Sequence, residues 1–138
     1  MKIALLGYGR MGKAIEEIAV KRGHTIVAKI DKDNENESYV ADVAINFSVP
    51  SAAYKNISDA LKRGIPVICG TTGWLDRLGE IESLCREKDG AFIYASNFSL
   101  GVNLFFELNK KLATMMEKYT HYDVSIEEIH HAKKIDKP

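Results

Sequence analysis

Apolar and polar positions alternate in blocks along the chain, and the blocks have two different spacings. Short, nearly continuous apolar runs are typical of strands buried on both faces, as in parallel sheets, and they occur here at 2–6, 25–30, 43–47, 66–69 and 91–95. Between these runs the apolar residues recur every three or four positions, which predicts amphipathic helices over 11–22, 50–63 and 74–88. Strand and helix therefore alternate, and this order predicts an α/β fold with a doubly wound parallel sheet.

The spacing changes after residue 97. Ser99 is a candidate N-cap for a long helix whose apolar residues are Leu104, Phe105, Leu108, Leu112 and Met115. Over 122–129, Tyr122, Val124 and Ile126 alternate with polar residues, which predicts a strand with one polar face. We therefore expect two domains: residues 1–97, and residues 98–138 as a hinge helix and the first strand of a truncated second α+β domain.

The composition excludes several classes of protein. The 138 residues are 46% hydrophobic and 28% charged, and 19 basic residues balance 19 acidic ones, which gives no bulk electrostatic basis for a nucleic-acid or membrane partner. No apolar run approaches the roughly 20 residues of a bilayer span, and Gly7 interrupts the N-terminal run where a signal peptide would continue. Two cysteines, Cys69 and Cys85, suggest reduced thiols and a cytoplasmic protein.

Residues 7–12, GYGRMG, match the G-x-G-x-x-G motif between a predicted strand and a predicted helix. In this motif Gly7 would permit a tight turn, Gly9 would let the backbone approach a pyrophosphate, and Gly12 would let the helix pack against the strand. The helix N-terminus adds unpaired N–H groups that attract phosphate. Asp31 follows Gly12 by 19 residues, where an acidic side chain binds the adenosine ribose. These features predict a Rossmann-like dinucleotide-binding domain over residues 1–97.

The type of dinucleotide stays open at this point. Asp31 favours NADH because a carboxylate meets the 2′-hydroxyl, whereas Lys32, Lys29 and Arg10 could accept the 2′-phosphate of NADPH. We therefore expect NADH, NADPH or both as cofactors. The alternative interpretation is a glycine-rich turn without a ligand, with Asp31 as a solvated loop residue.

Three further loops follow predicted strands and should line the same crevice, because ligands bind beyond the carboxyl ends of parallel strands. They are 46–48 (NFS), 70–73 (GTTG) and 96–99 (SNFS). The GTTG loop could also be a helix-capping turn with Thr71 or Thr72 as the N-cap. Phe47 and Phe98, taken individually, are more typical of packing residues than of ligand contacts.

The segment 127–136 (EEIHHAKKID) holds candidate catalytic groups. Histidine donates protons near neutral pH, and a nearby lysine stabilises developing negative charge. A metal site is disfavoured, because the adjacent histidines lack the spacing of H-E-x-x-H and no paired cysteines lie near them. The alternative is a polar end of a surface strand.

The motifs GYGRMG, INFSVP, GTTGW, ASNFSLGVN and EIHHAKKIDKP occur in this order, and together they resemble the 4-hydroxy-tetrahydrodipicolinate (dihydrodipicolinate) reductases over essentially the whole chain. The resemblance implies NAD(P)H-dependent reduction of a small cyclic dicarboxylate in diaminopimelate and lysine biosynthesis. Hydride would pass to C4 of the substrate with loss of water. The resemblance also implies a homotetramer in the complete protein.

The resemblance assigns roles to single residues. It implies that His130 is the general acid, that Lys134 assists it, and that His131 and Thr72 contact the substrate. The positions it assigns to the cofactor are Gly7, Gly9, Arg10, Met11, Gly12, Asp31, Lys32, Phe47, Gly70, Thr72, Asn97 and Phe98.

Two hypotheses follow. The first is a reductase of this kind; family members carry a Ser-Gly-Thr carboxylate-binding segment after the D-x-P motif, so we expect residues 1–138 alone to bind cofactor and turn over poorly. The second is a non-catalytic NAD(P)-binding module without a complete substrate site. A different dehydrogenase acting on an aspartate-derived substrate is disfavoured by the pairing of GTTG with the HHAKKIDKP segment.

Overall fold

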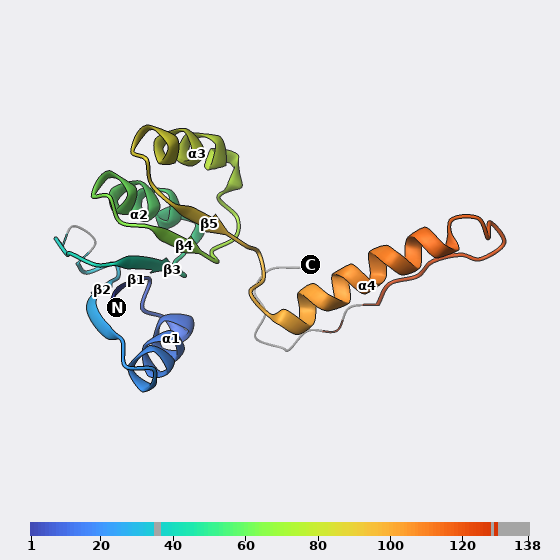
Figure 1. The fold of residues 1–138 in the computed structure, drawn as a ribbon, viewed down its shortest axis with the longest axis horizontal. Helices are drawn as coiled ribbons and strands as arrows, with labels where there is room; N and C mark the ends of the chain where they lie inside the picture. The colour runs from blue at the N-terminus through green and yellow to red at the C-terminus, as the bar shows by residue number, and fades with distance from the viewer. Residues whose placement is uncertain (35–36, 128, 130–138) are drawn as a thin grey trace. The chain divides into compact units, whose positions relative to one another are not determined.

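The computed structural model describes residues 1–34, 37–127 and 129. The chain divides into two compact units, Met1–Phe98 and the residues from Ser99 onward, and each is described by itself (Figure 1). The expected boundary, after residue 97, differs from this division by one residue.

The first unit is built on one parallel five-stranded sheet with the strand order β2-β1-β3-β4-β5. Its strands are β1 (Lys2–Leu6), β2 (Thr25–Ile30), β3 (Val43–Asn46), β4 (Val67–Cys69) and β5 (Phe92–Tyr94). Its α-helices are α1 (Arg10–Lys21), α2 (Pro50–Lys62) and α3 (Leu78–Glu87), and a 3₁₀ turn, η1 (Leu75–Arg77), precedes α3. The predicted alternation of strand and helix is confirmed except between β2 and β3, which follow each other without a helix.

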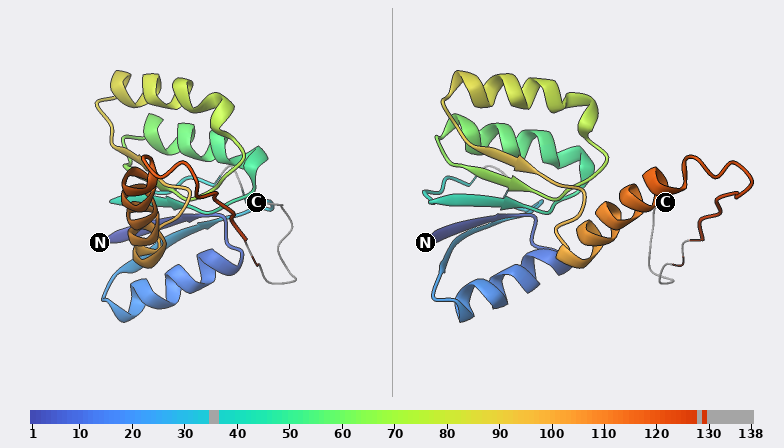
Figure 2. Two further views of the ribbon diagram at one scale, coloured as in Figure 1. Left: turned by 90° about the vertical axis from the view of Figure 1, so that its right-hand side faces the viewer. Right: turned by 45° about the vertical axis from the view of Figure 1, so that its right-hand side comes forward.

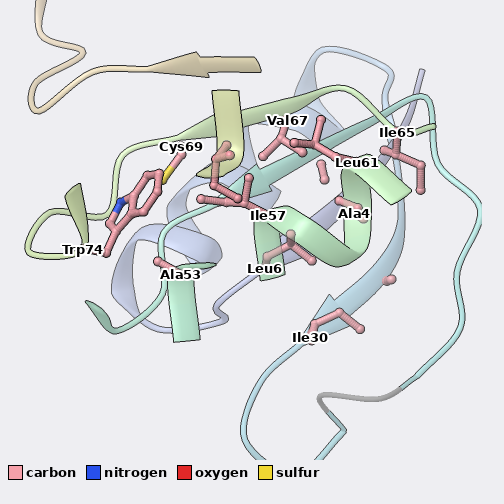
Figure 3. Close-up of a cluster of buried hydrophobic side chains, with 14 residues drawn as sticks. Ala4, Leu6, Ile30, Ala53, Ile57, Leu61, Ile65, Val67, Cys69 and Trp74 are labelled. Carbon is pink, nitrogen blue, oxygen red and sulfur yellow. The ribbon is translucent and has the colours of Figure 1, made fainter. Parts of the chain in front are cut away.

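The helices cover both faces of the sheet. Helix α1 packs below it, and α2 and α3 pack above it in the orientation of Figure 1; the views in Figure 2 show the same layers. Strand β1 is buried on both faces because Ala4 and Leu6 point into the cluster under α2 and α3, whereas Ile3 and Leu5 point into the cluster under α1. The larger cluster includes Ile57, Leu61 and Val67 (Figure 3). A continuous apolar run with no polar face is the pattern that this position requires.

The helix expected over 74–88 begins later in the structure. Trp74 is only 3% exposed, and its indole N–H donates to the carbonyl of Thr71 at 2.7 Å. Its ring also packs edge-on against Phe92 and Tyr94. These contacts hold Trp74 outside the helix, so the chain passes through η1 before α3 starts at Leu78.

The second unit contains α4 (Leu100–Met116). Ser99 is its N-cap and accepts a hydrogen bond from the Val102 N–H at 3.4 Å, as the sequence predicts. The strand expected over 122–129 is wrong for residues 122–127, which form no strand. Their apolar side chains Val124 and Ile126 are 80% and 86% exposed, and within the described residues no neighbouring strand supplies the backbone partners that a sheet requires.

None of the helices in the part of the chain that the structure describes has the length and apolar character needed to cross a bilayer.

Candidate functional site

A cavity of about 330 Å³ opens at the carboxyl ends of the central strands. The chain leaves β1 toward β2 on one side and leaves β3 toward β4 on the other, so the order of strands reverses between β1 and β3. Ligands of open α/β sheets bind at this reversal. The lining residues come from the end of β2, from the loops after β1, β2 and β3, and from the first two turns of α2: Gly7, Tyr8, Gly9, Ile30, Asp31, Lys32, Phe47, Ser48, Val49, Ala52 and Asn56.

The glycine loop has the geometry that its motif predicts. Gly7 has a φ of +94°, and a Cβ there would come within 2.7 Å of the Phe47 carbonyl carbon, so neither a side chain nor an ordinary backbone conformation fits. A Cβ on Gly12 would lie 2.5 Å from the Gly7 oxygen, which explains how closely α1 approaches the loop. Gly9, by contrast, has no atom within 4 Å of a built Cβ. Gly9 therefore leaves open space at the N-terminus of α1, where a pyrophosphate would bind.

Asp31 and Lys32 line the cavity at the end of β2, as the ribose-binding hypothesis requires. Asn34 holds this turn: its side-chain oxygen accepts the Asp31 N–H at 2.8 Å, and its amide donates to the Lys29 carbonyl at 2.9 Å. The Asp31 carboxylate accepts the Lys32 N–H at 2.9 Å. The acidic side chain is therefore fixed in orientation at the mouth of the cavity before any ligand binds. Asn34 was not among the residues predicted from the sequence, although asparagine in a polar loop is the signal for such a turn.

Lys29, one of three cations considered for a 2′-phosphate, is already paired. Its ammonium lies 2.7 Å from the Glu16 carboxylate, donates to the Tyr8 hydroxyl at 3.2 Å, and sits 4.6 Å from the centre of the Tyr8 ring. The Tyr8 hydroxyl in turn donates to Glu16. Hydrogen bonds from Lys29 and Tyr8 lower the pKa of Glu16, and the bond to Glu16 raises the pKa of Lys29. Arg10 and Lys32 are the better candidates for a phosphate contact.

The loops after β3 and β4 meet through an aromatic ring. The Phe47 ring lies directly over Gly70, where a built Cβ would come within 3.0 Å of the ring carbon Cδ1 and closer to two others. The same ring packs against Phe98, with centroids 6.0 Å apart. Phe47 therefore both packs and lines the cavity, and the two interpretations given from the sequence are compatible.

A buried hydrogen-bond network lies beneath these two loops. Asn46, which is 0% exposed, donates to the hydroxyl of Thr71 at 3.2 Å and accepts from the hydroxyl of Ser48 at 3.0 Å. The hydroxyl of Thr71 also accepts the Ser48 N–H at 2.9 Å. The alternative that Thr71 or Thr72 caps a helix is wrong, because the residue before η1 is Trp74 and no side chain caps that turn. Thr71 instead ties the β4 loop to the β3 loop.

The remaining expected site residues divide into three groups. Arg10, Met11 and Gly12 form the first turn of α1, next to the cavity. Gly70, Thr72, Asn97 and Phe98 lie in the loops that follow β4 and β5. His130, His131 and Lys134 lie outside the described residues.

The structure adds Val49, Ala52 and Asn56 to the cavity, which Ser48 of the expected 46–48 loop also lines. Sequence reasoning missed the first three because they become neighbours of the glycine loop only when α2 starts at this edge of the sheet. Among the residues that the structure describes, no three His, Cys, Asp or Glu side chains are grouped as metal ligands.

Comparison with known families gives two matches that together cover most of the chain. The family described as dihydrodipicolinate reductase, N-terminus, matches residues 33–98, and the one described as dihydrodipicolinate reductase, C-terminus, matches residues 101–138.

Curated relatives agree with these matches. A 4-hydroxy-tetrahydrodipicolinate reductase from Christiangramia forsetii is 60% identical over 141 aligned residues, which include 100% of this chain and 59% of that protein. One from Thermosipho africanus is 36% identical over 100% of this chain and 62% of its own length. The chain thus spans about three fifths of the length of these relatives.

Solved structures show the same fold at low identity. A putative homoserine dehydrogenase from Archaeoglobus fulgidus superposes with a TM-score of 0.56 at 20% identity, over 68% of this chain and 42% of that one. A hyperthermophilic archaeal homoserine dehydrogenase in complex with NADPH superposes with a TM-score of 0.52 at 17% identity, over 67% of this chain and 43% of that one. The first unit therefore has the Rossmann-like α/β fold of these dehydrogenases.

Proposed function

The chain belongs to the dihydrodipicolinate reductase family, and from this premise we propose that its protein reduces 4-hydroxy-tetrahydrodipicolinate to tetrahydrodipicolinate with a nicotinamide cofactor. The main support for this proposal is that the family match and the position of the cavity point to the same function. The matched segments belong to a reductase, and the cavity lies where a dinucleotide binds in an open α/β sheet.

The residues around the cavity fit a dinucleotide along its length. The open space at Gly9 and the N–H groups of α1 suit the pyrophosphate, and the fixed carboxylate of Asp31 suits the adenosine ribose. Beyond the pyrophosphate, the nicotinamide half would reach the ends of β3 and β4, next to Phe47, Gly70 and Thr72. When bound there, the cofactor supplies hydride.

The chain is proposed to accept both NADH and NADPH. Asp31 meets a free 2′-hydroxyl, and Lys32 beside it offers a cation to a 2′-phosphate. Because Lys32 is exposed beside the fixed Asp31 carboxylate, its ammonium can turn toward a 2′-phosphate when NADPH binds and away from the site when NADH binds.

The proposed chemistry needs a proton as well as a hydride. Hydride adds at C4 of the substrate while the C4 hydroxyl leaves as water, so the reaction consumes one proton. We assign its delivery to His130, with the cation of Lys134 stabilising negative charge that develops on the substrate. His131 and Thr72 are proposed substrate contacts, the substrate being a small dicarboxylate, and the assembled protein is proposed to be a homotetramer.

A turnover assay tests this function. NADH oxidation by the full-length protein, started with freshly generated substrate, is expected to be saturable. His130→Gln should lower kcat by about 100-fold, because general acid catalysis contributes that much, while the affinity for NADH stays unchanged. His121→Gln, which removes an exposed histidine beside Tyr122, is the matched control and should retain activity.

Binding of NADH without any turnover by the full-length protein would contradict the reductase and favour the non-catalytic module. Equal loss of NADH affinity and kcat in His130→Gln would contradict the role given to His130.

A further inference from the structure

We infer that Asn46 is a positioning residue: it holds the loops after β3 and β4 in the arrangement that receives the nicotinamide half of the dinucleotide. This inference rests on the proposed cofactor site. Asn46 itself touches no ligand, because it is 0% exposed beneath the loops at the end of β3.

The amide of Asn46 joins three separate elements. Its NH₂ group donates to the Thr71 hydroxyl at 3.2 Å and toward the Cys69 sulfur at 3.3 Å. Its carbonyl oxygen accepts from the Ser48 hydroxyl at 3.0 Å and from the Asn56 amide at 3.3 Å. One buried side chain therefore connects the β3 loop, the β4 loop and helix α2.

Thr71 completes the connection. Its hydroxyl accepts from the Asn46 amide and from the Ser48 N–H, and it contacts the Ser48 carbonyl at 3.4 Å. A hydroxyl has one proton to donate and two acceptor positions, so these three contacts use its full capacity. The backbone carbonyl of Thr71 also accepts the Trp74 indole N–H. A fully satisfied buried network of this kind specifies one arrangement of the segments that it joins.

The fixed segments carry the residues proposed for the nicotinamide half. Phe47 lies between Asn46 and Ser48, and Gly70 and Thr72 flank Thr71. The adenosine half also has supports of its own, since Asp31 is held by Asn34 and the Gly7 N–H is bound by the Ile30 carbonyl, although Gly7 lies against the Phe47 backbone as well. Loss of the Asn46 network should therefore weaken the nicotinamide half of the dinucleotide site more than the adenosine half.

The test compares NADH with ADP, which lacks the nicotinamide riboside, as ligands of the purified protein. Asn46→Ala and Thr71→Val both remove the link between the loops, and Thr71→Val keeps the side-chain volume in case Asn46→Ala folds poorly. In both variants the Kd for NADH should rise about tenfold, the equivalent of one or two lost hydrogen bonds, while the Kd for ADP stays within about twofold.

Two controls separate positioning from general destabilisation. Thr71→Ser keeps the hydroxyl and should bind NADH like the wild type. Val67→Ala truncates a core residue of β4 that is 1% exposed; it should lower the Tm without separating the NADH affinity from the ADP affinity.

Equal weakening of NADH and ADP, or no weakening in either linking variant, overturns the role of Asn46. Failure of the wild type to bind NADH at all overturns the proposed function together with this inference. If the linking variants lose affinity for NADH but not for ADP, and the wild type shows no turnover, the positioning role of Asn46 is supported and only the proposed reductase activity is contradicted.

Discussion

Two adjacent side chains of opposite charge, Asp31 and Lys32, line the part of the cavity that is proposed to bind the adenosine ribose. They differ in how firmly they are held. The Asp31 carboxylate accepts the Lys32 backbone N–H, and the Asp31 backbone N–H donates to the Asn34 side chain, whereas the Lys32 side chain is exposed. The carboxylate is thus part of the folded site, and the ammonium is an adaptable contact.

Lys32→Ala tests this division of roles. The Kd for NADPH should rise about threefold to fivefold, as expected for the loss of one exposed charge contact, while the Kd for NADH stays nearly unchanged. The variant retains the backbone N–H that Asp31 accepts, so the turn should persist. Parallel titrations with the two cofactors are the measurement.

Lys29→Ala is the matched control, because Lys29 is already paired with Glu16 and should discriminate little between the cofactors. Equal losses for NADH and NADPH in Lys32→Ala would show that Lys32 does not meet the 2′-phosphate. A selective loss in Lys29→Ala would move that role to Lys29.

Helices α2 and α3 are joined by three polar side chains at the surface. Glu80 on α3 accepts two hydrogen bonds from Arg77, at 2.9 and 2.8 Å, and one from the Tyr54 hydroxyl on α2 at 2.9 Å. The Arg77 guanidinium lies 3.2 Å from the centre of the Tyr54 ring. These bonds, the one to Arg77 foremost, lower the pKa of Glu80 from 4.5 to about 2.

This pKa implies a pH dependence of stability. Because the pKa is lower in the folded state, the contribution of Glu80 is complete above 4.5 and is lost as the pH falls through about 2. Glu80→Gln should therefore lower the Tm at neutral pH, and its difference from the wild type should shrink as the solution is acidified over this range. Thermal melts across a pH series provide the measurement.

Glu17→Gln, which removes a single exposed ion pair to Lys21, is the control and should change the Tm less. A difference between Glu80→Gln and the wild type that stays constant with pH would show that the carboxylate charge contributes nothing.

Hydrophobic spacing was sufficient to predict most helices and strands. It failed where a single side-chain contact sets the start of a helix, or where a strand lacks a neighbouring strand. The glycine loop, Asp31 and the strand ends could be predicted because their spacing reflects chain geometry. The start of α3 could not, since it depends on the buried indole of Trp74. The absence of a strand at 122–127 could not be predicted either. Alternation of apolar and polar residues describes only the side chains, whereas a strand also needs a neighbouring strand to pair with.

The hydrogen-bond network around Asn46 could not be predicted from the sequence for a related reason. The sequence shows Asn46 as a polar residue at the end of an apolar run, which indicates a loop as readily as a buried link. Its partners Ser48, Asn56 and Thr71 come from three segments, and only the fold brings them together.

Across the whole molecule, the two units differ in how much they bury. Both hydrophobic clusters lie in the first unit, on either face of its sheet. In the second unit, the apolar side chains of α4 are exposed, with Leu104 at 61% and Leu108 at 63%. The first unit thus has the core that independent folding requires.

Residues 1–98 alone are therefore expected to fold cooperatively and to bind NADH with a Kd within about threefold of that of the 138-residue chain, since the cavity lies wholly in this unit. NADH at 100 times its Kd should stabilise both proteins by about 2.7 kcal/mol. Circular dichroism melts with and without NADH measure the cooperativity of unfolding and the stabilisation by NADH. A non-cooperative melt of residues 1–98, or loss of binding, would show that the rest of the chain supports the site.

The contact between the Phe47 ring and Gly70 restricts how this sequence can change. Alanine at position 70 would bring its methyl group onto the Phe47 ring, so either the ring must move aside or a smaller residue must stand at position 47. A smaller residue at 47 alone would remove the ring that covers Gly70. The residue at position 70 therefore limits which side chain position 47 can hold in this conformation, although the two stand at the ends of different strands.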